Sequence, residues 1–134
     1  MQKEFQKWHA KKSQVEAIEK RPFFHERQIW YCRLGENVGF EQNGKGEEFL
    51  RPVLIVRKFG SQIFWAIPLT SAHKNIHQGN EKFYHVFSFK KGVIDAAILS
   101  QLRLVDAKRL MRLMGHIADV DFMIINKKIK ALLP

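Results

Sequence analysis

The sequence predicts a mostly β protein, a small and strongly bent antiparallel barrel with an α-helix at each end of the chain. Along the middle of the sequence, short runs rich in β-branched and aromatic residues alternate with turns that contain glycine or polar residues. At both ends, apolar residues instead recur at helical spacing. A chain of 134 residues is long enough for one domain that buries roughly two thirds of its unfolded surface.

The central runs give the expected strands in order. Residues 28–34 form the first strand, and a long polar loop at 35–48 follows it. Residues 51–59 and 62–67 are separated only by Gly60 and Ser61, which indicates a β-hairpin. After a second polar loop, further strands are expected at 83–89, 92–99 and 101–105. Residues 109–117 are compatible with a strand or a helix, and we favour a last strand broken near Gly115, because a helix follows shortly.

Amphipathic helices are expected at the two ends. Residues 3–20 contain no glycine or proline and carry apolar residues at helical spacing, and Arg21-Pro22 should end this helix. Asp119 is a candidate N-cap of the second helix, whose apolar residues recur through Leu133. We therefore divide the chain into an N-terminal helical extension, residues 1–27, and a main domain, residues 28–134.

Composition restricts the partners and the compartment. The formal net charge is +10, which favours a polyanion: nucleic acid, an acidic protein segment or an anionic membrane. A single cysteine excludes a disulfide framework or a thiolate zinc site within one chain. No apolar run approaches the roughly 20 residues of a membrane span, and the N-terminus lacks a signal-peptide core. We expect a cytoplasmic protein without a membrane partner.

Three residues that can act on a phosphodiester stand at the edges of the predicted hairpin. Glu41 lies in a glycine-containing loop, Arg51 begins the strand that continues Pro52-Val53-Leu54, and Thr70 ends the next strand. Taken singly, each has a plain alternative. The arginine can pair with a structural carboxylate, the threonine can be an ordinary turn residue, and the glutamate can be a solvated surface acid.

The flanking residues add specificity. The chain resembles the MazF/PemK toxins of bacterial toxin–antitoxin systems over residues 28 to 133. The matching segments are Trp30-Tyr31-Cys32-Arg33-Leu34, Gly39-Phe40-Glu41-Gln42, Arg51-Pro52-Val53-Leu54-Ile55-Val56, Pro68-Leu69-Thr70-Ser71, Ser100-Gln101-Leu102-Arg103 and the lysine-rich stretch 127–133. The loop between Gln42 and Arg51 is longer and more acidic than in the compact members.

This resemblance implies an SH3-like barrel of the MazF/CcdB type that forms a homodimer. It also implies a metal-independent endoribonuclease that an acidic cognate antitoxin inhibits. In the family, the arginine before proline and the hydroxyl residue that ends the next strand are the catalytic pair. By position these roles fall on Arg51 and Thr70, and the loop glutamate falls on Glu41.

The chemistry of RNA explains why such residues suffice. The 2′-OH attacks the adjacent phosphorus, so the products are a 2′,3′-cyclic phosphate and a 5′-OH, and the enzyme supplies no nucleophile. Arg51 can stabilise the phosphorane with two parallel hydrogen bonds. Thr70 can hold a non-bridging oxygen, and Glu41 is the candidate base.

Further residues are expected to contact single-stranded RNA. His73 and His77 lie four apart, but Asn75, Gly79 and the lack of a third ligand argue against a metal, so we expect no metal and no cofactor. One aromatic of the second hairpin strand is expected in the core, and the other can stack on an unpaired base. The expected contacts are Gln42, Lys45, Trp65, Ser71, His73, Lys74 and His77.

Two other functions remain open at this point. A CcdB-like gyrase poison shares the barrel, although such poisons depend on a C-terminal Trp-Gly-Ile, whereas this chain ends in Ala131-Leu132-Leu133-Pro134. A basic barrel can also bind RNA or protein without cutting, because a fold alone does not fix a function.

Overall fold

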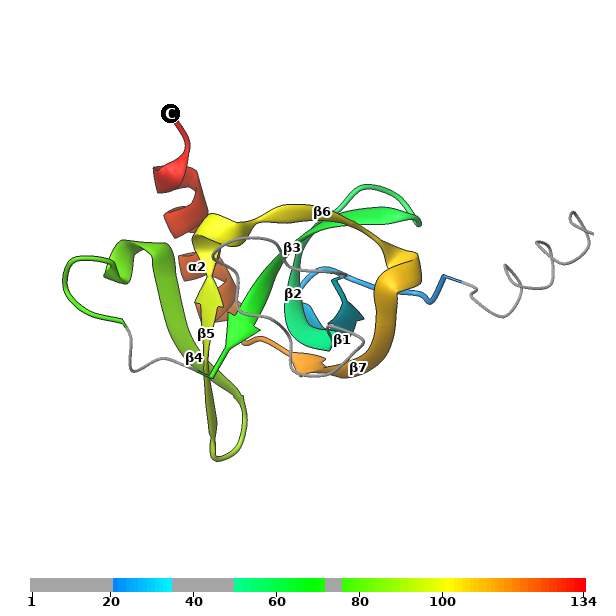
Figure 1. The fold of residues 1–134 in the computed structure, drawn as a ribbon, viewed down its shortest axis with the longest axis horizontal. Helices are drawn as coiled ribbons and strands as arrows, with labels where there is room; N and C mark the ends of the chain where they lie inside the picture. Colours follow the sequence, from blue (N-terminus) through cyan, green and yellow to red (C-terminus); the bar gives the residue numbers. More distant parts are fainter. Residues whose placement is uncertain (1–20, 35–49, 72–75) are drawn as a thin grey trace, which may run out of the picture.

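The computed structural model describes residues 21–34, 50–71 and 76–134. Within these ranges, seven β-strands, three short 3-10 helices and one α-helix are present (Figure 1). The strands are β1 (Gln28–Arg33), β2 (Leu50–Lys58), β3 (Ile63–Thr70), β4 (Tyr84–Lys90), β5 (Val93–Ile98), β6 (Arg103–Asp106) and β7 (Leu110–His116). The 3-10 helices are η2 (Glu81–Phe83), η3 (Leu99–Gln101) and η4 (Ala107–Arg109), and α2 (Asp119–Leu132) ends the chain.

All strand pairs are antiparallel, in the order β4-β5-β3-β2-β1-β7. The long strand β3 closes the curl because its two halves have different neighbours. Its first half pairs with β6, as in Phe64↔Val105, and its end pairs with β5, as in Thr70↔Ala96. The prediction of a strongly bent antiparallel sheet with a C-terminal helix is confirmed. The expected N-terminal helix at 3–20 lies outside the described residues.

Two hydrophobic cores occupy the two faces of the sheet. The inner core fills the curl, and the outer core lies between the convex face, the β4–β5 hairpin and α2. Strand β2 is buried on both faces, so its apolar residues read as a continuous run rather than an alternation. The inner core consists of Phe24, Trp30, Cys32, Leu34, Val53, Ile55, Phe64, Ala66, Val105, Ala107 and Leu110. The fully buried outer residues include Ile29, Leu54, Ile67, Leu69, Ala97 and Ile125.

The segment ahead of β1 packs onto the barrel. Phe24 is 1% exposed, and its ring centroid lies 5.0 Å from that of Phe64. Arg21 donates two hydrogen bonds of 3.1 Å to Asp106, which ties the segment to the end of β6. The core therefore begins at Phe24, ahead of the domain boundary at residue 28 that the sequence suggested.

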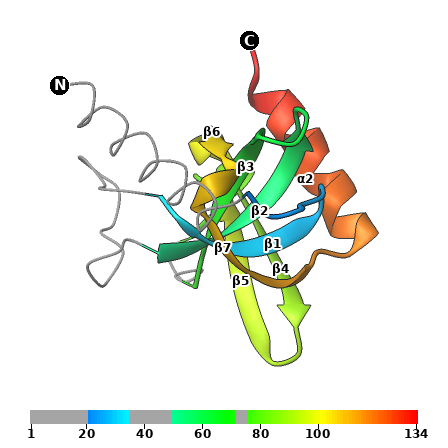
Figure 2. The same cartoon turned by 90° about the vertical axis from the view of Figure 1, so that its right-hand side faces the viewer.

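Helix α2 lies beside the strands (Figure 2), and polar contacts hold it there. His85 Nε2 lies 2.8 Å from Asp121 Oδ1, and Lys128 Nζ donates to Tyr84 O at 2.9 Å. Asp119 is not the N-cap. Ala118 occupies that position without a side-chain hydrogen bond. Asp119 is the first helical residue, where its negative charge interacts favourably with the positive end of the helix dipole. In the described residues, no helix has the length and apolarity needed to cross a bilayer.

The edge strand β7 confirms the predicted irregularity near Gly115. Its pairing with β1 shifts register between Ile29↔Gly115 and Trp30↔Leu113, so Met114 is an extra residue. A Cβ on Gly115 would meet the ring of Phe89 at 3.0 Å. Glycine at this position therefore lets β4 approach β7 closely.

Candidate active site

Strands β2 and β3 bring Arg51 and Thr70 to the same end of the hairpin. The recorded pairs Leu54↔Ile67 and Val53↔Pro68 set the register, and its continuation by two residues sets Arg51 opposite Thr70. Directly opposite residues of an antiparallel pair share a face and have Cβ atoms about 4.5–5.5 Å apart. Both side chains are partly buried, at the edge of the inner core.

A β-bulge decides which hydroxyl faces the arginine. Near the turn the pair is Arg57↔Trp65, but the next recorded pair is Ile55↔Ala66, so Val56 is an extra residue on β2. Bulges commonly re-aim side chains next to functional sites.

Without the extra residue, the register at the turn would continue unchanged and set Arg51 opposite Ser71. With it, Arg51 faces Thr70. Because neighbouring residues of a strand point to opposite faces, only one of these two hydroxyls can share the face of the guanidinium.

The strands on either side extend this row of residues. Cys32 on β1 pairs with Arg51, and Ala96 on β5 pairs with Thr70. Burial raises the pKa of the Cys32 thiol to about 12, against the opposing effect of Arg109 and Arg103. The thiol is therefore neutral at physiological pH, and a cysteine nucleophile is not available here.

Two further cations, which the sequence analysis did not select, lie close to this row. Arg103 and Arg109 both act electrostatically on Cys32, which pairs with Arg51. The guanidinium of Arg109 also donates to Arg33 O at 3.3 Å. Each is more than 50 positions from Arg51 in sequence, so only the pairing of β6 with β3 and of β7 with β1 reveals their proximity.

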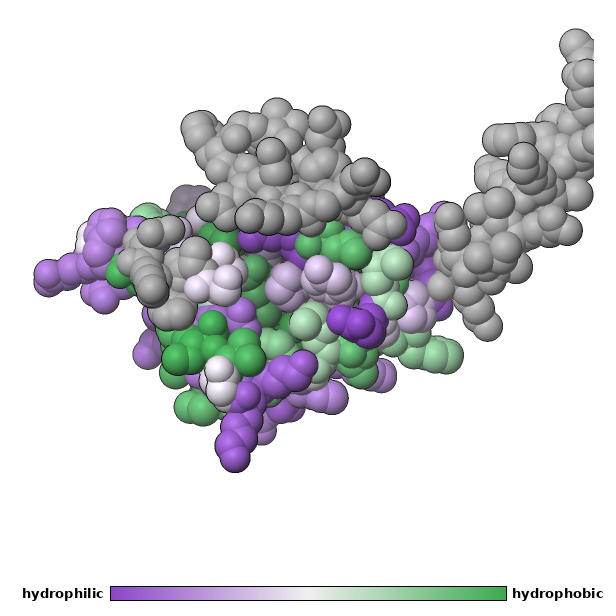
Figure 3. Space-filling view, turned by 60° about the horizontal axis from the view of Figure 1, so that its bottom comes forward, coloured by the Kyte–Doolittle hydropathy of each residue, from purple (hydrophilic) through white to green (hydrophobic). Residues whose placement is uncertain are grey.

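On its other side, the face of Thr70 continues onto the β4–β5 hairpin. The pairs Thr70↔Ala96 and Ala96↔Val86 cross three strands on one face. Ile94, two residues from Ala96, shares that face. Figure 3 brings this end of the molecule forward and shows hydrophilic side chains projecting beside hydrophobic surface.

The family model for the PemK-like, MazF-like toxins of type II toxin–antitoxin systems matches residues 25–133. The chain belongs to this family. The described fold agrees, with the MazF-like arrangement of a curled antiparallel sheet and a C-terminal helix.

Solved structures with this PemK-like, MazF-like fold include three toxins of low sequence identity. An endoribonuclease from a Mycobacterial species, in complex with its cognate antitoxin, is 17% identical, with a TM-score of 0.60 over 84% of this chain and 97% of that chain. The Mycobacterium tuberculosis toxin MazF-mt6 is 13% identical, with a TM-score of 0.58 over 78% and 94%. MazF from Deinococcus radiodurans is 19% identical, with a TM-score of 0.58 over 83% and 96%. No curated protein matches the chain.

In this PemK-like toxin, two of the expected RNA contacts lie beyond the end of β3. Ser71 directly follows Thr70 and is exposed. His77 is exposed in a turn, where its N–H donates to Asn80 Oδ1 at 2.8 Å and its Nδ1 accepts from the Gly79 N–H at 3.1 Å. The other expected site residues of these loops, Glu41, Gln42, Lys45, His73 and Lys74, lie outside the described residues.

Trp65 is not brought to Arg51 and Thr70. It is five residues before Thr70 on β3, about 17 Å along the strand, and it points to the other face. There it is 40% exposed and packs edge-on against Phe59, with ring centroids 4.9 Å apart. The preceding residue, Phe64, is fully buried, so Phe64 is the aromatic residue of this strand that lies in the core.

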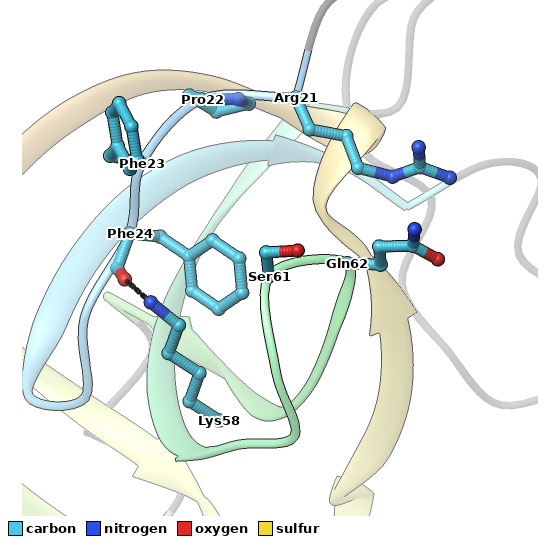
Figure 4. A pocket seen from close by; sticks show the side chains of 7 residues that line it. All are labelled: Arg21, Pro22, Phe23, Phe24, Lys58, Ser61 and Gln62. Carbon is cyan, nitrogen blue, oxygen red and sulfur yellow. Dashed lines mark hydrogen bonds between the residues drawn. The ribbon is translucent and has the colours of Figure 1, made fainter.

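A cavity of about 190 Å³ lies at the far, turn end of the same hairpin (Figure 4). Lys58 donates to Phe24 O at 2.8 Å and lies 4.7 Å from the Phe24 ring centroid, and Arg21 pairs with Asp106. The two cations that line this cavity, Lys58 and Arg21, thus hold the N-terminal segment in place. The cavity is lined by Arg21, Pro22, Phe23, Phe24, Lys58, Ser61 and Gln62.

Proposed function

We propose that this chain is the endoribonuclease of a type II toxin–antitoxin pair. It cleaves single-stranded RNA, mRNA in particular, without a metal and leaves a 2′,3′-cyclic phosphate and a 5′-OH. The observation that carries the proposal is the register of β2 and β3 at Leu54↔Ile67 and Val53↔Pro68, which, continued by two residues, puts Arg51 opposite Thr70. Family membership and the endoribonuclease activity named for structural neighbours support it.

In this proposal each residue has one task. Arg51 donates hydrogen bonds to the non-bridging oxygens and stabilises the charge that develops on the phosphorane. A guanidinium stays protonated at physiological pH, so Arg51 is unsuited to act as a base. Thr70 orients the reacting phosphate. Glu41 removes the proton of the 2′-OH. As the 2′-oxygen bonds to phosphorus, the bond from phosphorus to the 5′-oxygen breaks, and the leaving oxygen takes up a proton from the solvent to become the 5′-OH.

The RNA lies across a surface with a cationic surplus. Arg103 and Arg109 raise the local potential beside Arg51, and a net charge of +10 attracts a polyanion over a longer range. Further contacts with the RNA are proposed for Gln42, Lys45, Ser71, His73, Lys74 and His77. Trp65 lies on the opposite face of β3, so it contacts RNA only where the RNA passes round to that face.

The active form is a homodimer that pairs through β7. This strand ends the sheet, and its outer edge has no partner strand among the described residues. Its Met111 and Leu113 are 48% and 43% exposed. An edge strand with exposed apolar residues needs a covering partner, and two-fold dimers are the commonest assemblies of soluble proteins.

We further propose that the protein acts in the cytoplasm and that an acidic antitoxin inhibits it. An acidic segment that folds over the cationic surface would take the place of RNA phosphate near Arg51. The gyrase-poison alternative leaves the opposed arginine and threonine without a task, so we do not favour it.

The direct test is to incubate the purified chain with RNA of mixed sequence, with and without a chelator. We expect discrete cuts with cyclic phosphate and 5′-OH ends, unchanged by the chelator. Addition of the acidic protein encoded next to this gene should abolish them. Intact RNA at every protein concentration would favour the non-cutting RNA-binding barrel instead.

A further inference from the structure

We propose that the β4–β5 hairpin is the arm that holds the RNA nucleotides flanking the cleaved bond. Val86 and Ile94 form an apolar floor under a base, and Lys90 and Lys91 contact backbone phosphates. The inference deepens the proposed function and depends on it.

The first support is continuity with the catalytic pair. The recorded pairs Thr70↔Ala96 and Ala96↔Val86 carry the Thr70 face across to the edge strand β4. Ala96 is fully buried, whereas Val86 and Ile94 are 45% and 50% exposed. An RNA molecule held at Thr70 thus meets an aliphatic surface next. The distance is one or two spacings between neighbouring β-strands, about 4.8 Å each.

The second support is the charge at the tip. Lys90 and Lys91 are both exposed, and neither ammonium has an ion-pair partner in the part of the chain that the structure describes. In Figures 1 and 2 the tip projects below the rest of the described chain, and Figure 3 shows hydrophilic side chains at that end. Two adjacent free cations on a projecting arm are suited to a polyanion.

The third support is rigidity, because an arm guides RNA only if it holds its own shape. Ser88 Oγ lies 2.9 Å from Lys90 O and 2.6 Å from Val93 O, so its hydroxyl closes the turn. Gly92 takes a φ of +81°, which a side chain would strain. At the base of the arm, Phe87 is buried in the outer core.

The lysines at the tip of the hairpin lie too far from Thr70 to take part in the cleavage step. Val93, the first residue of β5, lies three residues from Ala96, which is about 10 Å along the strand, and Lys91 lies beyond it in the turn. The lysines therefore contact only flanking nucleotides. Their loss should weaken the binding of long RNA without slowing the cleavage of a minimal substrate.

The test compares Lys90→Gln/Lys91→Gln with a matched control, Lys127→Gln/Lys130→Gln, on the exposed side of α2. Figures 1 and 2 place the C-terminal end of α2 at the opposite end of the molecule from the tip. Binding is measured with a 2′-O-methyl RNA of mixed sequence, which cannot be cut, between 50 and 200 mM salt. A contact with one phosphate of a single strand adds about 0.7 to the slope of log K against log salt.

We expect the slope of the hairpin variant to be smaller than that of the wild type by about 1.4. When the salt concentration rises fourfold, the drop in affinity should therefore be about 7-fold smaller for this variant than for the wild type. The control should lose nothing. The isosteric change Val86→Thr should weaken binding without altering the slope. On a fragment of about four nucleotides around a mapped cut site, the Lys90→Gln/Lys91→Gln variant and its control should cleave at the wild-type rate.

Three results would overturn the proposal. A hairpin variant with wild-type slope and affinity, on a wild-type protein that does cut RNA, rejects the arm alone. Unchanged RNA binding with loss of the antitoxin complex assigns the surface to a protein partner. A wild-type protein that neither binds nor cuts RNA removes the proposed function together with the arm.

Discussion

Replacement of Phe24 tests whether the packed barrel begins ahead of β1. Phe24 is 1% exposed and contacts the ring of Phe64, and the Lys58 ammonium lies 4.7 Å from the centroid of the Phe24 ring. Truncation of a buried phenylalanine to alanine typically costs about 3–5 kcal/mol, through lost transfer free energy and the cavity left behind. The chain supplies its own control, because the adjacent Phe23 is 92% exposed. Phe23→Ala should therefore change the free energy of unfolding by no more than about 0.5 kcal/mol.

Urea unfolding, followed by tryptophan fluorescence, measures both variants. Phe24→Ala should lower the midpoint strongly at an unchanged m-value, whereas Phe23→Ala should match the wild type. Equal midpoints for the two variants, or a loss below about 1 kcal/mol for Phe24→Ala, would refute the assignment of this segment to the core.

Three further predictions concern single groups. Arg21 donates hydrogen bonds that lower the pKa of Asp106 below 3.8, so the pair stabilises the fold above that pH and its contribution is lost as the pH falls through the folded-state pKa. Asp106→Asn should cost under about 1 kcal/mol at pH 7, and urea midpoints should converge with the wild type in acid. Cys32, with a pKa of about 12, should resist iodoacetamide at pH 8 until urea unfolds the chain, and rapid alkylation of the native protein would contradict its burial. Gly60→Ala should cost about 1–2 kcal/mol by strain at a φ of +89° alone, against no loss for Ser61→Ala, as measured by urea midpoints.

The local parts of the fold follow from the sequence because their causes are local. Apolar runs bounded by glycine and polar residues predict the strands, and Gly60 indicates the hairpin turn. The division of β3 between β5 and β6 was not predictable, because it depends on contacts between segments more than 25 residues apart.

The opposition of Arg51 and Thr70, the proposed catalytic pair, likewise depends on structure that the sequence does not reveal. A two-residue turn at Gly60 and Ser61 would set Arg51 opposite Thr70 directly. The structure reaches that register differently, since Phe59 N donates to Ile63 O across a wider turn and the bulge at Val56 then restores the pairing. Neither the wider turn nor the bulge has a residue signature here, because Val56 fits the strand pattern like its neighbours.

The central claim is that Arg51 and Thr70 form the catalytic pair and that Ser71 does not. The most direct measurement is kcat for RNA cleavage by Arg51→Ala, Thr70→Val and Ser71→Ala, each checked for an intact fold by circular dichroism. We predict a loss on the order of 100-fold or more for Arg51→Ala, a large loss for the isosteric Thr70→Val, and a change in KM alone for Ser71→Ala. Wild-type kcat in Arg51→Ala, or a loss of kcat in Ser71→Ala as large as in Thr70→Val, would contradict the account.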